Sequence, residues 1–377
     1  MTSPDVVVVG GGPVGLAAAI ALRQRGFDVL ITDRAQPPID KPCGEGLMPD
    51  GVAILRRLGI EIESECGLPF RGIRFTEAGY SAEGSFAAGN GLGIRRTTLH
   101  QHMIDQAAES GIAMRWGETA RAMDRSAVEI GGRKVTCRWV VGADGRESAV
   151  RQWAGLYAPP RTRRRIGLRQ HFQLAPWTDF VEVHWHDRGQ AVVTPVARGE
   201  VCVSLLMNGA DDRFPELLSL FPELQQRLNG AQPTSAARGA ISGSAIIRSV
   251  VSDRVALVGD AAGAVDALTG EGLSLGFRHA IALADALAQN NLPQYERAHR
   301  RINRPPELMA RLMLLLGKRR RPRRRVLRAL AAQSRLFTFM LSVHTGAVPV
   351  SAAPLGAVAG FFRRLIIADS IRARPVG

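Results

Sequence analysis

The start of the chain alternates between apolar runs and glycine in a pattern that predicts two strands joined by a helix. Asp5 to Val9 is a short β-branched run followed by consecutive glycines. Apolar positions then recur at helical spacing from Leu16 to Arg25, and Gly26 marks the end of that helix. A second apolar strand, Asp28 to Thr32, leads into Asp33. This order predicts a strand–turn–helix–strand unit of a parallel α/β sheet.

The middle of the chain has a different period, because short apolar runs alternate with polar positions between Pro and Gly turns. Such alternation predicts antiparallel β-structure. The clearest strands are expected at Ile166 to Leu174, Phe180 to His186, Ala191 to Val196 and Val201 to Met207. Apolar strands that run into glycine, at 139–141 and 254–258, lie on either side of this region. We therefore predict an antiparallel sheet inserted between two halves of a parallel sheet.

Helical spacing dominates the later part of the chain. One helix is expected around Phe214 to Leu228, a second from near Gly272 past Ala288, and more throughout residues 293–377. Residues 336–362 contain no Lys, Arg, Asp or Glu, but Pro and Gly interrupt them, which argues against one continuous membrane-spanning helix. Two alternatives remain, a helix pair packed on the core and apolar helices partly embedded in a membrane. We favour the second.

The charge of the chain suggests an anionic partner. There are 49 basic and 34 acidic residues, a net charge of +15. Seven of the eight residues from Lys318 to Arg325 are basic, and apolar helical stretches flank them. Because no nucleic-acid module or interleaved aromatic residue accompanies this run, we expect no nucleic-acid partner. An anionic membrane surface bound through Lys318–Arg325 fits better.

The cysteines and the N-terminus indicate the compartment. The chain has four scattered cysteines without a CxxC pair, which argues against a disulfide framework and against a metal site. Its first residues lack the cationic segment of a secretory signal. We expect a cytoplasmic protein that the basic run can hold at the inner face of the membrane.

The glycine run after the first strand has the form GxGxxG, from Gly10 to Gly15. In such a turn Gly10 permits the tight bend, Gly12 lets the backbone approach a pyrophosphate, and Gly15 lets helix and strand pack closely. Asp33 stands at the end of the second strand, where a carboxylate can accept hydrogen bonds from both ribose hydroxyls. The pattern predicts a dinucleotide site, and a glycine turn in an unrelated α/β domain is the alternative.

Two later segments make a family resemblance specific. Val140 to Arg151 (VVGADGRESAVR) resembles a DG motif, and Gly259 to Gly272 (GDAAGAVDALTGEG) resembles a GD motif. With the first glycine turn, the chain resembles the group I FAD-dependent oxidoreductases of the para-hydroxybenzoate hydroxylase fold, which include aromatic-ring hydroxylases and geranylgeranyl reductases. The resemblance implies that Asp144 lies near the flavin pyrophosphate and the approach path of NAD(P)H. It also implies that Asp260 binds the ribityl chain.

The resemblance implies a set of FAD-binding residues spread along the chain. These are Gly10, Gly12, Pro13, Val14, Gly15, Asp33, Arg34, Arg96, Asp144, Asp260, Gly270, Gly272 and Leu273. Gly270 and Gly272 would let the next helix point its N-terminus at the flavin pyrimidine ring. We favour Arg96 over Arg95 as the arginine of an Arg-x-x-Leu segment, although a solvated arginine at a helix start is an alternative. Arg34 either packs near the adenine or is a plain surface residue.

The same resemblance divides the chain into parts. The fold class it implies is α/β, a Rossmann-like FAD-binding parallel sheet with an inserted antiparallel β substrate domain and a helical C-terminal region. The FAD-binding domain would comprise 1–65, 95–155 and 245–292. The substrate-binding domain would comprise 66–94 and 156–244, and the helical basic region would comprise 293–377.

Three residues are candidates for catalysis. Lys41 to Pro49 (KPCGEGLMP) resembles the Cys-Gly-x-Gly loop of geranylgeranyl reductase-like members, which implies that Cys43 faces the flavin, and a buried structural thiol is the alternative. Glu45 and Glu271 are candidate polar groups at the same face. On the predicted sheet, His171 or His184 could deprotonate a phenol, although strand histidines are more often structural.

Three functions fit these motifs. The first is hydroxylation of a lipophilic aromatic, such as a phenolic lipid, polyketide or quinone precursor, with FAD as cofactor and NADH or NADPH as reductant. The second is flavin-dependent reduction of prenyl or polyene double bonds, favoured by Cys43 and by the LTGEG segment ending at Gly272. The third, a flavin-bound scaffold, would leave the DG motif unexplained. We favour the first.

Overall fold

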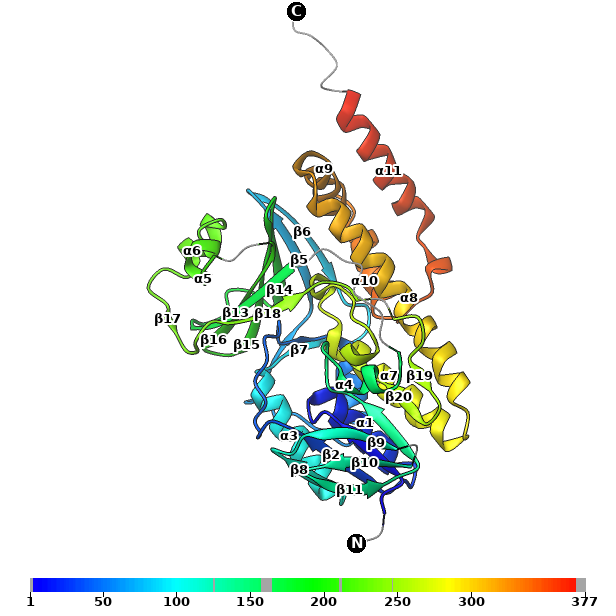
Figure 1. Ribbon diagram of the computed structural model, residues 1–377. Coiled ribbons are helices and arrows are strands. Elements are labelled where there is room, and N and C mark those ends of the chain that lie inside the picture. The colour runs from blue at the N-terminus through cyan, green and yellow to red at the C-terminus, as the bar shows by residue number, and fades with distance from the viewer. Residues whose placement is uncertain (1–2, 125, 157–164, 210–211, 246, 371–377) are drawn as a thin grey trace, which may run out of the picture.

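The structure is a computed structural model that describes residues 3–124, 126–156, 165–209, 212–245 and 247–370. Two large sheets and a group of C-terminal helices make up the molecule (Figure 1). The predicted α/β fold, with an inserted antiparallel sheet and a helical C-terminal region, is confirmed.

The parallel sheet has six strands in the order β19-β20-β12-β1-β2-β8. Their bounds are Val251–Ser252, Val255–Leu257, Trp139–Gly142, Val6–Val9, Val29–Asp33 and Ala113–Trp116. All neighbours run parallel except the edge pair β19 and β20. Every residue of β1 is buried, which explains its continuous run of valines. The ends of β1, β2 and β12 therefore present their following turns at one edge of the sheet.

Helices and a small sheet cover this core. The helices are α1 (Pro13–Arg23), α2 (Pro49–Arg57), α3 (Arg96–Glu109), α4 (Ala149–Trp153) and α7 (Gly272–Ala288). A three-stranded sheet of β9 (Ala120–Asp124), β10 (Ala127–Ile130) and β11 (Arg133–Thr136) completes it. Helix α7 packs on α1 and ends at Ala288, where the sequence pattern suggested that it would continue.

The antiparallel sheet has eight strands, and the four expected from alternation are all present. In the order β17-β13-β16-β15-β14-β5-β6, with β18 also paired to β13, the bounds are Gln232–Pro233, Arg165–Gln173, Glu200–Asn208, Gly189–Ala197, Phe180–His186, Gly72–Glu77, Tyr80–Ser85 and Arg238–Ser242. Strand β5 joins β14 in parallel, so residues distant in the sequence extend the same sheet. A further small sheet pairs β3 (Gly46–Leu47) and β4 (Leu68–Phe70) with β7 (Gly91–Gly93).

Different helices cover the two faces of the antiparallel sheet. One face packs on α5 (Phe214–Leu218) and α6 (Pro222–Arg227). The single helix expected over Phe214 to Leu228 is therefore wrong, because Pro222 lacks a backbone N–H and starts a new helix instead of continuing the first. The other face packs on the C-terminal helices.

The C-terminal region forms α8 (Leu292–Gly317), α9 (Arg320–Ala331), α10 (Ser334–His344) and α11 (Leu355–Ser370), drawn yellow to red in Figure 1. Short 3-10 turns lie at Gly259–Ala262, Ala267–Thr269 and Val350–Ala352. Within the described residues, no single helix is both long and apolar enough to cross a membrane. Helices α9 and α10 pass that test only together, with a bend of 103° between them.

Candidate FAD and substrate site

A cavity of about 650 Å³ lies where the two sheets and the C-terminal helices meet. Most of the expected FAD-binding residues line it: Gly12, Pro13, Val14, Asp33, Arg34, Arg96, Asp144, Asp260, Gly270, Gly272 and Leu273. We call this part of the cavity the motif end. Gly10 and Gly15 are not among the lining residues, because they pack against neighbouring backbone beneath the cavity.

The glycine turn after β1 combines two kinds of glycine. Gly10 has a φ of +111°, and a Cβ there would lie 2.4 Å from the Ala143 carbonyl carbon. A Cβ on Gly15 would lie 1.8 Å from the Gly10 oxygen, so both positions exclude side chains. A Cβ on Gly12 would meet only Arg96, at 3.7 Å, because Gly12 borders the cavity. Gly12 is also the N-cap of α1 and offers no side-chain cap, which leaves the first amides of that helix available to an anion.

Two side chains hold this turn in place. One Asp33 oxygen accepts from the Gly11 amide at 2.7 Å, and the other accepts from the Ala35 amide at 2.8 Å. The Ile39 amide donates to Nδ1 of His100, so Nε2 of His100 carries the hydrogen that it donates to the Gly11 carbonyl at 2.7 Å. Burial lowers the pKa of His100, which favours this neutral form. The sequence interpretation missed His100, since nothing local to α3 indicates its partner.

The DG and GD motifs are joined by an arginine. The Asp144 carboxylate accepts from the Ser148 hydroxyl at 2.5 Å and from the Ala149 amide at 2.7 Å, so it caps α4 as well as lining the cavity. The buried Arg151 guanidinium donates to the carbonyl of Arg146 at 2.7 Å and to that of Ala261 at 3.0 Å. This contact brings the two motifs, far apart in the sequence, to the same end of the cavity.

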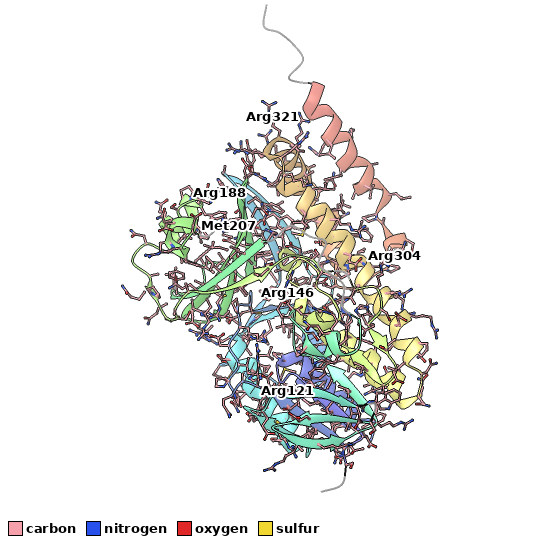
Figure 2. The ribbon with its side chains drawn as sticks, in the orientation of Figure 1. Arg121, Arg146, Arg188, Met207, Arg304 and Arg321 are labelled. Carbon is pink, nitrogen blue, oxygen red and sulfur yellow. The ribbon has the colours of Figure 1, made fainter. Side chains whose placement is uncertain are left out.

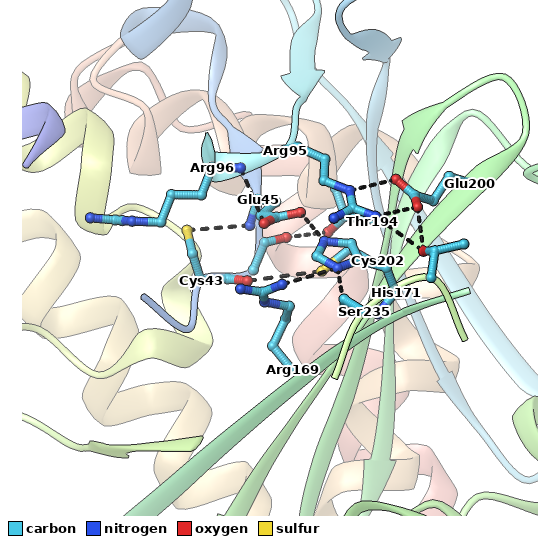
Figure 3. Close-up of polar contacts among 12 residues, drawn as sticks. Cys43, Glu45, Arg95, Arg96, Arg169, His171, Thr194, Glu200, Cys202 and Ser235 are labelled. Atoms are coloured by element: carbon cyan, nitrogen blue, oxygen red, sulfur yellow. Dashed lines mark hydrogen bonds and ion pairs between the residues drawn. The ribbon is translucent and has the colours of Figure 1, made fainter. Parts of the chain in front are cut away.

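Arg95 and Arg96 differ in what their side chains contact. Arg95 forms an ion pair with Glu200, in which its Nε lies 2.7 Å from a carboxylate oxygen. Arg96 lines the cavity, and its buried Nε has no hydrogen-bond partner among the described residues. Figure 3 shows its guanidinium extending past Cys43 and away from Glu45. The geometry therefore agrees with the choice of Arg96 as a cofactor contact.

The loop with Cys43 is anchored by a buried polar cluster (Figure 3). Nε2 of His171 lies 2.5 Å from Oε2 of Glu45, whose other oxygen accepts from the Arg96 amide at 3.1 Å. The Glu45 amide in turn donates to the Cys43 sulfur at 3.4 Å. Burial raises the pKa of the Cys43 thiol, which keeps it protonated, and Cys43 lines the cavity.

The same cluster includes Cys202, and its geometry bears on metal binding. One ligand atom each from Glu45, His171 and Cys202 lies within 4.8 Å of the others. Each of these atoms already has a hydrogen-bonding contact, because His171 is bonded to Glu45 and to the Ser235 hydroxyl, and Sγ of Cys202 lies 3.9 Å from the Cys43 carbonyl oxygen. Burial also raises the pKa of Cys202 well above its usual value, which disfavours the thiolate that a metal requires.

Neither histidine that was considered as a base lines the cavity within the described part of the chain. His171 is fully buried against Glu45, Arg169 and Ser235. His184 bonds Thr76 and Glu182 on the face of β14 opposite the cavity, since Val181 and Val183 occupy the cavity face. The alternation along β14 was correct in period, but the face assigned to substrate was the wrong one.

A second part of the cavity lies under the C-terminal helices and is lined mainly by apolar side chains. We call it the helix end, and its lining comprises Ile73, Phe75, Val181, Val183, Val192 and Leu206 from the sheet and Met309, Met313, Phe337, Met340, Leu341 and His344 from α8 and α10. Phe75 and Phe337 pack with ring centroids 4.8 Å apart. An elongated lipophilic molecule would lose its water on entering this end.

Comparison with known proteins decides the family. A family model described as an FAD binding domain matches residues 3–292. The chain belongs to this FAD-binding family. It is an FAD-dependent oxidoreductase, and the resemblance to group I members of the para-hydroxybenzoate hydroxylase fold is confirmed. The residues fit the cofactor, because the open face of Gly12 and the unpartnered Nε of Arg96 both border the cavity.

Two similar proteins of known function are reductases. Menaquinone reductase of Mycobacterium tuberculosis is 30% identical over 317 residues, which cover 77% of this chain and 78% of that protein. Digeranylgeranylglycerophospholipid reductase 2 of Methanopyrus kandleri is 28% identical over 294 residues, covering 71% and 73%. A solved flavoprotein/dehydrogenase from Cytophaga hutchinsonii has a TM-score of 0.78 at 17% identity and covers 91% of this chain and 93% of that one. That likeness concerns the fold alone.

Proposed function

We propose that this oxidoreductase reduces carbon–carbon double bonds in the prenyl chain of a lipophilic substrate. The observation that carries the proposal is the helix end, whose lining is apolar except for a few side chains and leads directly to the motif end. The names of the relatives point the same way, because menaquinone and digeranylgeranylglycerophospholipid both carry prenyl chains. The position of Cys43 on the cavity wall agrees with the reductase-like loop.

Each end of the cavity would have its own task. At the motif end, Arg96, Asp260 and the first amides of α1 would hold FAD, which when bound supplies the electron pair for reduction. We propose NADH or NADPH as the reductant that returns the oxidised flavin to its reduced form. At the helix end, Met309, Met313 and Phe337 would orient the prenyl chain and exclude water.

Hydroxylation of a lipophilic aromatic is the second candidate. It is favoured by the largely apolar lining of the helix end, since excluding water protects an oxygenating flavin as well as a reducing one. It is weakened by the placement of His171 and His184, neither of which reaches the cavity wall in the described structure.

An anaerobic incubation distinguishes the two reactions. Purified holoenzyme, NADH or NADPH, and either a menaquinone or a geranylgeranyl lipid are combined without oxygen, and the product is weighed by mass spectrometry. Reduction of a prenyl double bond yields a product that is two hydrogens heavier and keeps that mass after exposure to air, whereas reduction of a quinone ring is reversed by air. A product that is one oxygen heavier and forms only in air would replace our proposal with hydroxylation, and no product under either condition rejects both.

We further propose that the protein collects its substrate at an anionic membrane surface. Helix α8 turns Met309 and Met313 toward the cavity and exposes Leu308, Leu312 and Leu315 by 56%, 45% and 59%. This leucine stripe continues toward Lys318–Arg321, whose side chains are exposed, and Figure 2 shows Arg321 at the outer end of α9, away from Arg146 at the cavity. In such an arrangement the apolar side chains can insert among lipid acyl chains, and the cationic side chains can bind the anionic headgroups above them.

A further inference from the structure

The helix end of the cavity stops at the same level on three neighbouring strands of the antiparallel sheet. On β14, Val183 lines the cavity, whereas Trp185, the next residue on that face, is buried outside the lining. On β15, Val192 lies opposite Val183 and lines the cavity, whereas Gln190 lies opposite Trp185 and is buried outside it. On β5, Phe75 is the last lining residue in the described structure. A line across these strands therefore marks the far end of the cavity.

The opposite direction along the same strands leads to the loop that contains Cys43. Gly46 also lines the cavity, and a Cβ there would lie 3.7 Å from the Val181 side chain. Val181 stands two positions before Val183 on β14, a distance of about 7 Å along an extended strand. A molecule that lies along β14 would therefore have one part beside the Cys43 loop and another part near Trp185.

Three aromatic side chains, Phe75, Trp185 and Phe337, close the far end, and we call them the end wall. The Phe75 ring packs on Phe337 with centroids 4.8 Å apart and meets Trp185 edge-on at 5.7 Å. Phe75 and Phe337 line the cavity, and Trp185 supports Phe75 from behind. The Phe337 ring has little room to move back, because a Cβ on Gly84 of β6 would lie 2.9 Å from it. The end wall therefore presents fixed aromatic rings to the cavity.

The interior becomes ionic behind the end wall. The Arg323 guanidinium carbon lies 6.0 Å from the centroid of the Trp185 ring, and Arg323 pairs with Glu77 and Asp187, each at 2.8 Å. Glu77 is buried and follows Phe75 by two residues on β5. A hydrocarbon chain that displaced these contacts would leave buried charges without partners, which is costly. An apolar molecule in the cavity should therefore stop at the end wall.

We propose that the end wall receives the tip of the prenyl chain and thereby determines which double bond lies beside the flavin. The inference rests on the proposed reductase function. Aromatic rings suit a hydrocarbon tip, whereas a polar head group would lose its water there without gaining a partner. The position of the reduced bond is then counted from the tip of the chain. Chains of different length with the same tip are reduced at the same distance from that tip.

Two phospholipids that carry farnesyl or geranylgeranyl chains test this register. Neither contains a quinone ring, so a gain of two hydrogens that persists in air reports a reduced double bond. Holoenzyme is reduced with dithionite without oxygen and mixed with each lipid in detergent, and ozonolysis with mass spectrometry locates the first bond that is lost. We expect the same bond in both lipids when it is counted from the tip. The same bond counted from the head group, or equal reduction of every bond, would overturn the inference.

Substitutions at the far end should move the register in opposite directions. Phe337→Leu deepens the cavity and should favour the bond one unit farther from the tip, whereas Val183→Phe fills space before the end wall and should favour a bond nearer the tip. We expect the ratio of neighbouring products to change about tenfold, the scale of a methylene-sized change in an apolar pocket. Phe339→Leu is the matched control, because Phe339 lies on the same helix and packs on the same core but is outside the described lining. An unchanged ratio in both variants, or an equal change in the control, contradicts the inference.

A binding measurement gives a readout that needs no turnover. A geranylgeranyl phospholipid brominated at its tip should quench the fluorescence of Trp185 in the oxidised holoenzyme, and a lipid brominated beside its head group should not. Trp185→Phe identifies this contribution, because the quenching should disappear in that variant. Quenching of Trp185 by the head-group isomer alone overturns the inference, even where the cavity variants fail to fold. If the unmodified protein adds hydrogen to neither lipid, the proposed reductase function fails, whatever the fluorescence shows.

Discussion

The two ends of the cavity are built in different ways. The motif end is made of short turns after parallel strands, where glycine geometry and backbone amides decide what fits. The helix end is made of side chains from a distant sheet and from the C-terminal helices, brought together only by tertiary packing. Comparing them suggests that cofactor binding and substrate choice can be changed separately, because few residues belong to both.

The strongest way to break the motif end is through its glycines. In Gly15→Ala the new Cβ would lie 1.8 Å from the Gly10 oxygen, so we expect a loss of about 3 kcal/mol or more of stability together with loss of flavin. In Gly12→Ala the Cβ meets no backbone, so the protein should fold with an unchanged apo melting temperature yet bind little FAD. Thermal unfolding and flavin absorbance check both. Full yellow colour in Gly12→Ala would contradict the placement of FAD.

At the helix end, one substitution can fill part of the cavity without contacting the cofactor site. Met309→Trp should block the apolar lining and lower turnover of a prenyl lipid about tenfold or more, with flavin content unchanged. Leu308→Trp is the matched control, since the adjacent residue is 56% exposed on the same helix. Steady-state kinetics in detergent compare the two. Equal effects of both substitutions would mean that α8 does not border the substrate.

The contrast also explains what the sequence could predict. The motif end follows from local chemistry, because Gly10, Gly12 and Asp33 lie in turns whose geometry depends on a few neighbouring residues. Even there, a Cβ on Gly11 would lie 2.1 Å from the Trp116 ring, and this constraint is visible only in the folded structure because Trp116 is distant in the sequence. A run of three glycines was the one available signal.

The helix end could be predicted only in outline. Alternation in β14 gave the period of the strand, but the covering helices determine that Val181 and Val183 face the cavity while His184 does not. In the same way, Glu271 was noted as a polar candidate, whereas its partner His344 comes from a helix much later in the chain. Which faces meet depends on packing between elements, and periodicity within one element does not contain that information.

The basic run Lys318–Arg325 also contains two kinds of residue, some buried in the fold and some exposed. Arg323 is buried and pairs with Glu77 and Asp187, each at 2.8 Å, so it serves the fold. Arg319 and Arg321 are exposed. Arg319→Glu and Arg321→Glu should each weaken binding to anionic vesicles by about 1 kcal/mol in low salt, and less in high salt. Vesicle co-sedimentation measures this, and salt-independent or unchanged binding would remove the membrane proposal.

The last prediction concerns stability and pH at the junction of the two ends. Glu271 has a pKa raised from 4.5 to about 8 in the folded protein, so folding takes up a proton between these values. The stability that this proton provides is fully present below about pH 4.5 and is lost as pH rises through about 8. His344 acts in the opposite sense, because its lowered pKa costs stability as pH falls through about 4. Relative to Glu271→Gln, the unmodified protein should therefore lose a few degrees of melting temperature between pH 5 and 8. Parallel melting curves for the two proteins across that range would mean that the carboxyl is not held in its protonated form.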